Sequence, residues 1–185
     1  TIINCPKIQS LIPLSNYKGG SIKIDGNNSL SDLNGLQNFT DIFKLSILNT
    51  SISSLNGIAP ITEIENTLHI ENNPNITSLD VFNKVELIGN NAIETNFKII
   101  NNKNINSLKD FDNLTEIKAD LEIRNNELLN NFCGIKDALN NNFTRKYNVS
   151  GNLYNPKIKD IKNDNCSVLS NNDFLTSSTK IFPNP

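Results

Sequence analysis

The feature that most constrains this chain is a repeated apolar triplet. An apolar residue, any residue and a second apolar residue, followed by asparagine-containing turn residues, recur six times along 185 residues. The triplets are Ile22-Lys23-Ile24, Leu45-Ser46-Ile47, Leu68-His69-Ile70, Phe97-Lys98-Ile99, Leu121-Glu122-Ile123 and Tyr147-Asn148-Val149. Their centres lie 23, 23, 29, 24 and 26 residues apart. Self-similarity at a nearly constant period is typical of repeat architectures.

The stretch after each triplet repeats as well. In four successive repeats, an apolar residue occupies every third position: Leu33, Leu36, Phe39 and Ile42; Leu55, Ile58, Ile61 and Ile64; Leu79, Phe82, Val85 and Ile88; Leu108, Phe111, Leu114 and Ile117. A constant step of three matches neither the alternation of a strand nor the three-and-four spacing of an α-helix. It predicts a tight arc that returns the chain to the next strand, with one apolar residue pointing inward per turn.

A three-residue strand cannot bury its two apolar side chains alone, so each repeat needs a neighbour above and below. We call one strand with its return arc a coil. Six stacked coils predict a β-solenoid whose parallel sheet extends roughly 25 to 30 Å, because neighbouring strands lie about 4.8 Å apart. The chain contains 36 asparagines, a bias that fits a repeated turn but also an AT-rich genome. Turn asparagines are expected to bond backbone groups rather than a ligand; they are Asn27, Asn73, Asn102 and Asn126.

Two strings carry a resemblance to known repeat families. The pattern Leu121-x-Ile123-x-x-Asn126-x-Leu128 resembles the leucine-rich repeat consensus. Residues 68–76, with residues 114–117 ahead of a following strand, look more like the receptor L domain. That family is a short right-handed β-helix of insulin-type and growth-factor receptor ectodomains and of many bacterial surface proteins. The resemblance covers about residues 8 to 155 and implies a right-handed β-helix with a binding function.

The last coil differs from the others and predicts a helical cap. Residues 132–139 are expected to form a short helix, and a second helix is expected to run through Ile161, with Asn155 as N-cap and Pro156 at N1. Such a cap would keep the edge of the sheet from pairing with other chains. We therefore expect a solenoid over residues 1–166 whose cap spans residues 132–166.

The tail carries a resemblance of its own. Asn172-Asp173-Phe174, a Ser/Thr spacer and then Ile181-Phe182-Pro183-Asn184-Pro185 are similar to the entry into the C-terminal sorting domain of the Bacteroidetes type IX secretion system. The resemblance implies a linker over residues 167–180 and a sorting domain that starts at residues 181–185. It also implies recognition by the type IX machinery, then release or anchoring at the outer-membrane surface. Because the chain starts with Thr1, we expect it to lie inside a longer precursor.

Cysteine usage predicts one disulfide and no metal site. The three cysteines form no Cys-x-x-Cys pair and no Cys/His cluster, so no metal or other cofactor is expected. We expect Cys133 and Cys166 to pair and to hold the cap in place. Cys5 remains, either free or paired with a cysteine outside this chain.

The outward positions of the strands are candidate binding residues, because the repeat does not dictate them. One column reads Lys23, Ser46, His69, Lys98, Glu122 and Asn148, and its neighbour reads Asp25, Leu48, Glu71, Ile100, Arg124 and Ser150. Leu48 and Ile100 are apolar where water would favour polar residues. They mark either a contact patch or ordinary scattered apolar residues.

A second candidate is the segment of residues 89–94, which accounts for the 29-residue spacing as an insertion beside the sheet. Insertions in repeat proteins map to loops on one face, often the binding face. Asn90 and Asn91 are its candidate binding residues. Tolerated drift is the alternative explanation for the insertion.

Composition disfavours several function classes. With His69 as the only histidine and no nucleophile motif, a catalytic triad or zinc chemistry lacks its residues. Glu71 and Glu122 are the remaining catalytic option, of the β-helix polysaccharide-active kind, but they lie two coils apart. A net charge of −2 without single-sign runs disfavours nucleic acid, and no apolar run of about 18 residues predicts a membrane span.

The sequence therefore predicts a secreted or surface-displayed module, not an enzyme. It is expected to bind a protein or a glycan through its parallel sheet and the adjacent loop. A structural stalk or spacer within a larger surface protein is the alternative.

Overall fold

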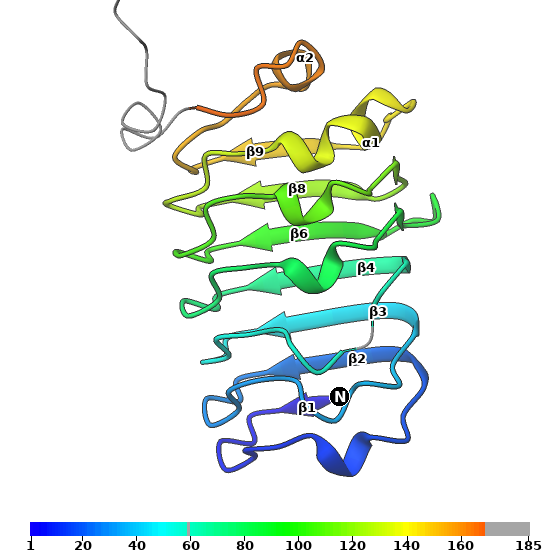
Figure 1. Ribbon diagram of the computed structural model, residues 1–185, viewed down its shortest axis with the longest axis vertical. Helices are drawn as coiled ribbons and strands as arrows, with labels where there is room; N and C mark the ends of the chain where they lie inside the picture. The colour runs from blue at the N-terminus through cyan, green and yellow to red at the C-terminus, as the bar shows by residue number, and fades with distance from the viewer. Residues whose placement is uncertain (59, 169–185) are drawn as a thin grey trace, which may run out of the picture.

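The computed structural model describes residues 1–58 and 60–168, and its strands form one sheet in which every strand pairing is parallel. The strands are β1 (Ile2–Ile3), β2 (Gly19–Asp25), β3 (Asp41–Leu48), β4 (Glu63–Glu71), β5 (Leu87–Ile88), β6 (Asn96–Ile100), β7 (Glu116–Ile117), β8 (Asp120–Arg124) and β9 (Tyr147–Ser150). Seven of them stack in the order β1-β2-β3-β4-β6-β8-β9 (Figure 1). This stack of parallel strands in chain order is compatible with the predicted solenoid.

The register confirms the repeat. The first apolar residues of the six triplets pair from strand to strand, from Ile22 in β2 to Tyr147 in β9. One strand was not predicted: β1 pairs Ile2 with Ile24, so a further strand precedes the first triplet. The sequence pattern does not predict β1, because Ile2-Ile3-Asn4 lacks the apolar-x-apolar signature.

The sheet branches at a corner. The first residues of β4 pair with β5, which pairs with β7, whereas the last residues of β4 pair with β6. In β2 and β3 both ladders belong to one continuous strand, which changes register at the corner. In the two following coils the corner is open, and separate short strands lie on either side of it.

The return arcs supply the other half of the core. All sixteen residues of the predicted step of three are at most 8% exposed, which confirms that they point inward. Three-residue 3₁₀ helices form at Ile12–Leu14, Asp80–Phe82, Lys109–Phe111 and Cys133–Ile135. Aromatic rings stack between coils, as Phe82 does on Phe111 with 5.4 Å between ring centroids. Each such side chain contributes roughly 1.5 to 3 kcal/mol by leaving water.

Two residues after each strand define its turn. The first has a left-handed backbone in all seven coils, with φ between 51° and 68°, and is always asparagine or glycine: Asn4, Gly26, Asn49, Asn72, Asn101, Asn125 and Gly151. These are the residue types that adopt this conformation most readily. The second is the buried turn asparagine of the sequence prediction, or its equivalent.

The buried asparagines form a ladder from coil to coil. The Oδ1 of Asn102 accepts the backbone N–H of Asn73 at 3.1 Å, and the Nδ2 of Asn102 donates to the carbonyls of Ile70 and Ile100 at 3.0 Å. Asn126 and Asn152 continue the same pattern. This confirms the predicted structural role, since each amide satisfies backbone groups that the turn buries.

Cys5 and Thr50 occupy the ladder position in their coils. Their backbone N–H groups donate to the Oδ1 atoms of Asn27 and Asn73, at 3.0 and 3.2 Å. Neither side chain carries an amide, so the ladder is interrupted at both coils. The structure thus gives Cys5 a place in the turn, and it pairs with no cysteine among the described residues.

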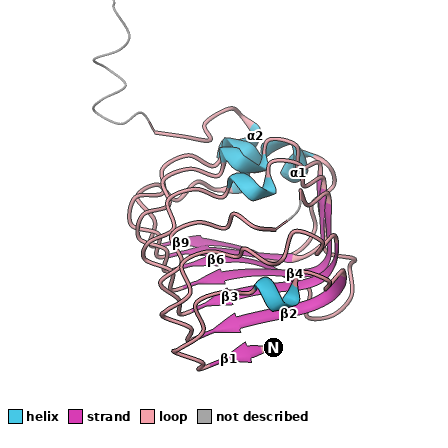
Figure 2. Cartoon of the chain, turned by 60° about the horizontal axis from the view of Figure 1, so that its bottom comes forward, coloured by secondary structure: helices cyan, strands magenta, loops and turns pink. Residues whose placement is uncertain are grey.

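The C-terminal cap consists of α1 (Lys136–Asn140) and α2 (Ile158–Lys162), which lie together at the end of the stack far from β1 (Figures 1 and 2). The predicted disulfide is present, with the Cα atoms of Cys133 and Cys166 4.9 Å apart. Ala138, Leu139 and Ile161 are fully buried and close the end of the core.

The predicted start of the second helix is wrong. The N-cap is Lys157, whose backbone N–H donates to the carboxylate of Asp160 at 2.9 Å. Asn155 is instead committed to the ladder, because its Oδ1 accepts both the backbone N–H and the Nδ2 of Asn152, at 2.9 and 3.1 Å. It takes the place of the asparagine that a further coil would supply.

The predicted linker begins on residues that are still bound to the segment just before the cap. Ser167 forms an isolated antiparallel β-bridge with Asn131, and the N–H of Val168 donates to the carbonyl of Asn130 at 3.1 Å. The rest of the linker and the sorting-domain start, residues 169–185, lie outside the described residues.

Candidate ligand-binding face

The two predicted columns lie on the outer face of the sheet in the expected register. Residues of the first column pair in sequence from Lys23 to Asn148, and those of the second from Asp25 to Ser150. Because side chains alternate between the faces of a strand, both columns point away from the core. The structure therefore brings the predicted residues of the sheet together.

Charged residues of these columns are neutralised by one another. Lys23 Nζ lies 3.0 Å from an oxygen of Asp25, and Glu122 contacts both Lys98 Nζ at 3.1 Å and Arg124 Nε at 2.6 Å. The columns hold three lysine or arginine residues and three carboxylates. The central part of the face is thus a mosaic of internal ion pairs rather than a field of one sign.

Hydrogen bonds and burial set the protonation of this mosaic. A hydrogen bond from Asn49, then one from Lys23, lowers the pKa of Asp25. Burial alone would raise the pKa of Glu122, but hydrogen bonds and charge from Lys98 and Arg124 outweigh it and lower that pKa. Burial lowers the pKa of His69 despite the Glu71 carboxylate 2.7 Å from its Nε2. At neutral pH the carboxylates of Asp25 and Glu122 are therefore ionised and the imidazole of His69 is neutral.

The expected apolar exposure is wrong for Ile100, which is only 4% exposed. Its neighbours in register are Glu71 and Arg124, whose aliphatic stems flank it on the sheet. Leu48 is partly exposed. The two residues do not form an apolar patch.

A third outward column was missed by the sequence analysis. Ser21, Lys44, Thr67, Asn96 and Asp120 pair from β2 to β8, and Lys146 precedes Tyr147, the partner of Leu121. The signal was available, since the alternation of each triplet extends one position further toward the N-terminus. We call these six residues the third column.

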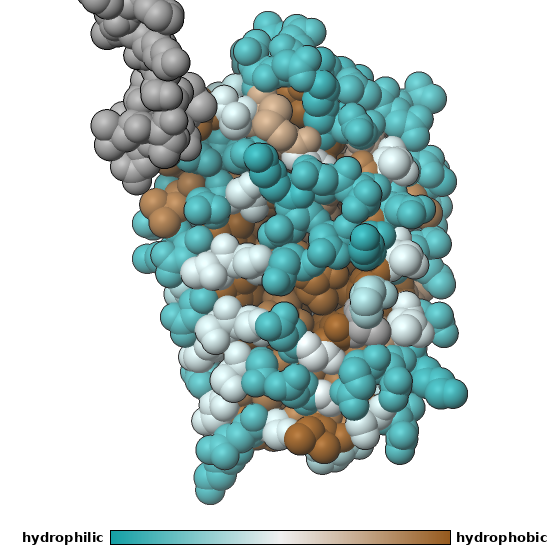
Figure 3. Space-filling view, in the orientation of Figure 1, coloured by the Kyte–Doolittle hydropathy of each residue, from teal (hydrophilic) through white to brown (hydrophobic). Residues whose placement is uncertain are grey.

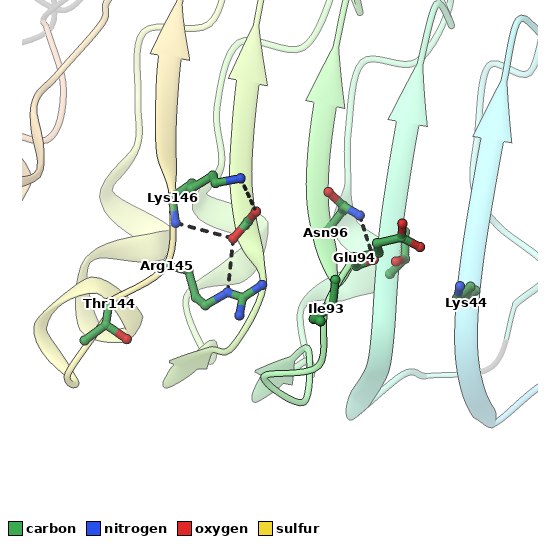
Figure 4. A pocket seen from close by; sticks show the side chains of 9 residues that line it. Lys44, Ile93, Glu94, Asn96, Thr144, Arg145 and Lys146 are labelled. Atoms are coloured by element: carbon green, nitrogen blue, oxygen red, sulfur yellow. Dashed lines mark hydrogen bonds and ion pairs between the residues drawn. The ribbon is translucent and has the colours of Figure 1, made fainter.

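Five residues of the third column, all except Ser21, form the floor of a groove of about 790 Å³ (Figure 4). Lys44 and Lys146 lie toward its two ends, with Thr67, Asn96 and Asp120 between them. Ile93, Glu94, Thr144 and Arg145 complete the lining. Four strand spacings separate β3 from β9, so the floor is about 19 Å long.

The insertion loop, residues 89–95, is the wall of this groove and is tied to the sheet. The N–H of Gly89 donates to the carbonyl of Ile64 at 2.9 Å, and the N–H of Asn91 donates to that of Lys118 at 3.1 Å. The hydroxyl of Thr95 lies 3.1 Å from the carbonyls of both Ala92 and Lys118. The loop therefore has a defined conformation.

Arg145 braces the loop from two strands away. Its Nε donates to Asp120 at 3.0 Å, and its terminal nitrogens lie 3.4 Å from the carbonyls of Asn91 and Ala92 and from the Thr95 hydroxyl. Figure 4 shows Arg145 and Lys146 converging on one carboxylate, that of Asp120. Arg145 thereby fixes the loop relative to the groove floor.

Within the loop, the predicted residues are not those that face the groove. Asn90 accepts the N–H of Ala92, and Asn91 holds a left-handed turn, so both shape the loop. Ile93 and Glu94 line the groove instead, and Ile93 is 90% exposed. A loop sequence without periodicity does not show which of its side chains face the groove.

The structure also places the carboxylates considered for catalysis. Glu71 and Glu122 lie on β4 and β8, with β6 between them, about 10 Å apart by strand spacing. Glu71 is hydrogen-bonded to His69, and Glu122 forms ion pairs with Lys98 and Arg124. In residues 1–58 and 60–168, no cluster of three His, Cys, Asp or Glu side chains has the arrangement of a metal site.

No family model, curated protein or solved structure matches this chain. Among the helices that the structure describes, none combines the length and apolar character of a membrane span.

Proposed function

We propose that the chain is a β-solenoid of the leucine-rich repeat or receptor L-domain kind that serves as a binding module on an exported protein. Its ligand, a protein or a glycan, is bound on the outer face of the sheet, in the groove between the third column and the insertion loop. The strand stacking and the internal asparagine ladder support the solenoid. The resemblance of the tail to a type IX sorting domain supports a secreted or cell-surface location.

The observation that carries this proposal is the braced loop with an exposed Ile93 at the edge of a groove. Ile93 is 90% exposed and lines the groove, so its apolar side chain is accessible to a ligand. The loop is held by Arg145 and by backbone bonds to Ile64 and Lys118. Fixing a loop before binding reduces the entropy that a ligand must overcome, which is what a binding site requires.

A structural stalk is the second candidate, and the mosaic of ion pairs favours it. Where Lys23, Lys98 and Arg124 are already paired with carboxylates, a ligand must displace those contacts. The groove and the mosaic thus point to different functions. Changes in each region separate the two.

The test is binding of the purified domain to glycan and protein arrays. Ile93→Asp, and Lys44→Glu combined with Lys146→Glu, are expected to abolish the array signal that the unchanged domain gives. Ile12→Asp is the matched control, because Ile12 is 64% exposed on the first return arc, away from the groove. Signals that survive both groove changes and charge reversals at Lys23, Lys98 and Arg124 would favour the stalk. If the domain cleaves a polysaccharide and Glu71→Gln or Glu122→Gln abolishes that activity, the protein is an enzyme and the proposed binding function is wrong.

The location is tested separately. An antibody against the domain should label intact cells or detect the protein in the medium, and deletion of residues 169–185 together with any following sorting segment should retain it in the periplasm. Periplasmic retention of the undeleted protein would contradict type IX export.

A further inference from the structure

Strand β9 is the C-terminal edge of the sheet, and one side of it carries no ladder. The carbonyl of Ser150 accepts the N–H of Asn125, which follows β8, at 3.0 Å, and the carbonyl of Lys146, which precedes β9, accepts the N–H of Leu121 in β8 at 2.9 Å. Alternate residues of a strand direct their backbone groups to opposite sides. The N–H and C=O groups of Tyr147 and Val149 therefore point away from β8, and no hydrogen bond from another described residue reaches them.

The cap closes the core but leaves this edge open, contrary to the sequence prediction. Helix α2 buries Ile161 against the end of the core. The segment that leads into α2 stands opposite β9, with the Tyr147 hydroxyl bonded to the carbonyl of Pro156 at 2.7 Å. Between this segment and β9 lies a groove of about 610 Å³. We call it the edge groove; its lining residues are Tyr147, Asn148, Val149, Asn155, Pro156, Lys157, Ile158 and Lys159.

The charge of the edge groove has one sign. Lys157 and Lys159 line it and are exposed, and none of its lining residues within the described part of the chain is acidic. The carboxylate of Asp160 is engaged by the backbone N–H of Lys157 at the start of α2. Ile158 and Val149 are partly exposed and add apolar surface. The groove therefore combines unpaired backbone groups, a small apolar surface and two cations.

We propose that the edge groove binds an acidic peptide in extended conformation, which adds a strand to β9. Backbone bonds to Tyr147 and Val149 supply the affinity that is common to strand addition, and side-chain contacts supply the selectivity. Carboxylates of the peptide pair with Lys157 and Lys159. Because β9 has four residues, the paired part of the peptide is about 13 Å long. This site is independent of the groove beside the insertion loop.

Hydrogen exchange of the free protein tests the open edge first. The amides of Tyr147 and Val149 are expected to exchange rapidly, whereas those of Asn148 and Ser150, which point to β8, are expected to be protected. Protection of all four amides in the free protein would mean that the edge is already covered, and would overturn the proposal.

Peptide binding tests the occupant. The probe is a fluorescent ten-residue peptide of alternating valine and glutamate, and its control is the same peptide with lysine in place of glutamate. Only the acidic peptide is expected to raise the anisotropy, with slowed exchange at Tyr147 and Val149 and weaker binding at higher salt. Equal binding of both peptides, or no binding of either, would refute the charge assignment.

Variants of the protein separate the two contributions. The double variant Lys157→Glu with Lys159→Glu is expected to weaken binding of the acidic peptide at least tenfold. Lys162→Glu, on the last turn of α2, is expected to leave binding unchanged. Val149→Pro removes one outward N–H without removing a bond to β8, and is expected to weaken binding of the acidic peptide although both lysines remain. If that variant does not fold, the lysine variants still decide the matter. A concentration-dependent doubling of the protein's mass that Val149→Pro abolishes would identify a second copy of the chain as the occupant. It would overturn the proposal that the occupant is an acidic peptide.

Discussion

The coils around β2 to β4 and those around β5 to β8 differ in how the chain passes the corner of the sheet. In the first region one strand of seven to nine residues runs through the corner and changes register there, as between Ile42 and Lys44. In the second region the strand is divided, and residues 89–95 or 118–119 lie between its pieces. Both pieces keep their partners in the sheet. The corner is therefore the position where the repeat accepts extra residues without disturbing the core, and that is where the candidate site lies.

The asparagine ladder differs between the same regions. From Asn73 to Asn152 it is continuous and is closed by Asn155, whereas Thr50 and Cys5 interrupt it in the earlier coils. The later coils are also cross-linked by the disulfide. We expect the coils near β1 to open first on unfolding, since stability is not uniform across stacked repeats.

The largest effect is expected from breaking the continuous ladder. Asn102→Leu leaves the buried N–H of Asn73 without its acceptor and removes one bond from each of the carbonyls of Ile70 and Ile100. The Ile100 carbonyl keeps its bond from the N–H of Asn72. At roughly 1 to 3 kcal/mol for the unsatisfied N–H and roughly 0.5 to 1.5 kcal/mol for each lost carbonyl bond, the free energy of unfolding should fall by about 4 kcal/mol. Urea unfolding followed by circular dichroism measures it.

Matched controls sharpen that result. Asn104→Leu removes one exposed bond, to the carbonyl of Pro74, and should cost about 0.5 to 1 kcal/mol. Thr50→Ala, at the interruption, should cost less than Asn102→Leu, since Thr50 has no amide. Equal losses for Thr50→Ala and Asn102→Leu would contradict the distinction between the two regions.

The next effect concerns the disulfide. Replacing both Cys133 and Cys166 by alanine frees a loop with a sequence separation of 33 residues. The loss of this cross-link should lower the free energy of unfolding by about 3 to 4 kcal/mol. Hydrogen exchange should accelerate in α1 and α2 before it changes in β2 and β3. An increase confined to the coils near β1 would show that the cap does not stabilise the end to which it is attached.

A smaller and local effect is expected at the loop brace. Arg145→Ala removes the contacts to Asp120 and to the insertion loop, which should cost about 1 to 2 kcal/mol of global stability. Faster exchange at Asn91 and Thr95 should accompany it, with no change in β2. The control is Lys146→Ala, because the Lys146 side chain is 87% exposed and its loss should change stability by less than about 0.5 kcal/mol. An unchanged loop in Arg145→Ala would remove the argument for a preformed site.

The sequence predicted those parts of the fold that repeat. Inward positions recur with fixed spacing, so the core, the strand register and the role of Asn102 followed from the pattern. A pairing between Cys133 and Cys166 followed because they flank the one segment that departs from the repeat. The role of Asn155 did not follow, since Asn-Pro is an equally good helix start, and only the three-dimensional ladder shows which partner it has.

The candidate site was less predictable because its residues are defined by neighbours in space. The loop was found as an irregular spacing, but Arg145 contacts it across more than 50 residues of sequence. Ile100 was expected at the surface because its position in the strand points outward, and the sequence does not show that Glu71 and Arg124 flank it. Outward alternation identified the two columns within and after the triplets; the third, one position before each triplet, follows from the same alternation and was missed.

The smallest effect is a pH dependence at His69, the only imidazole in the chain. Burial lowers its pKa in the folded protein, so the unfolded chain, with a value near 6.5, binds the proton more readily. Stability should therefore decline modestly as the pH falls from about 7 to 5, because protonation favours the unfolded state in that window. The Glu71 carboxylate raises the pKa of His69, against the effect of burial, and so keeps the pH dependence small. His69→Gln should remove the slope while leaving stability at pH 7.5 nearly unchanged, and chemical unfolding at both pH values would measure it. A slope of the opposite sign would mean that the Glu71 ion pair outweighs burial, and the centre of the sheet would then be more open to water than the mosaic of ion pairs indicates.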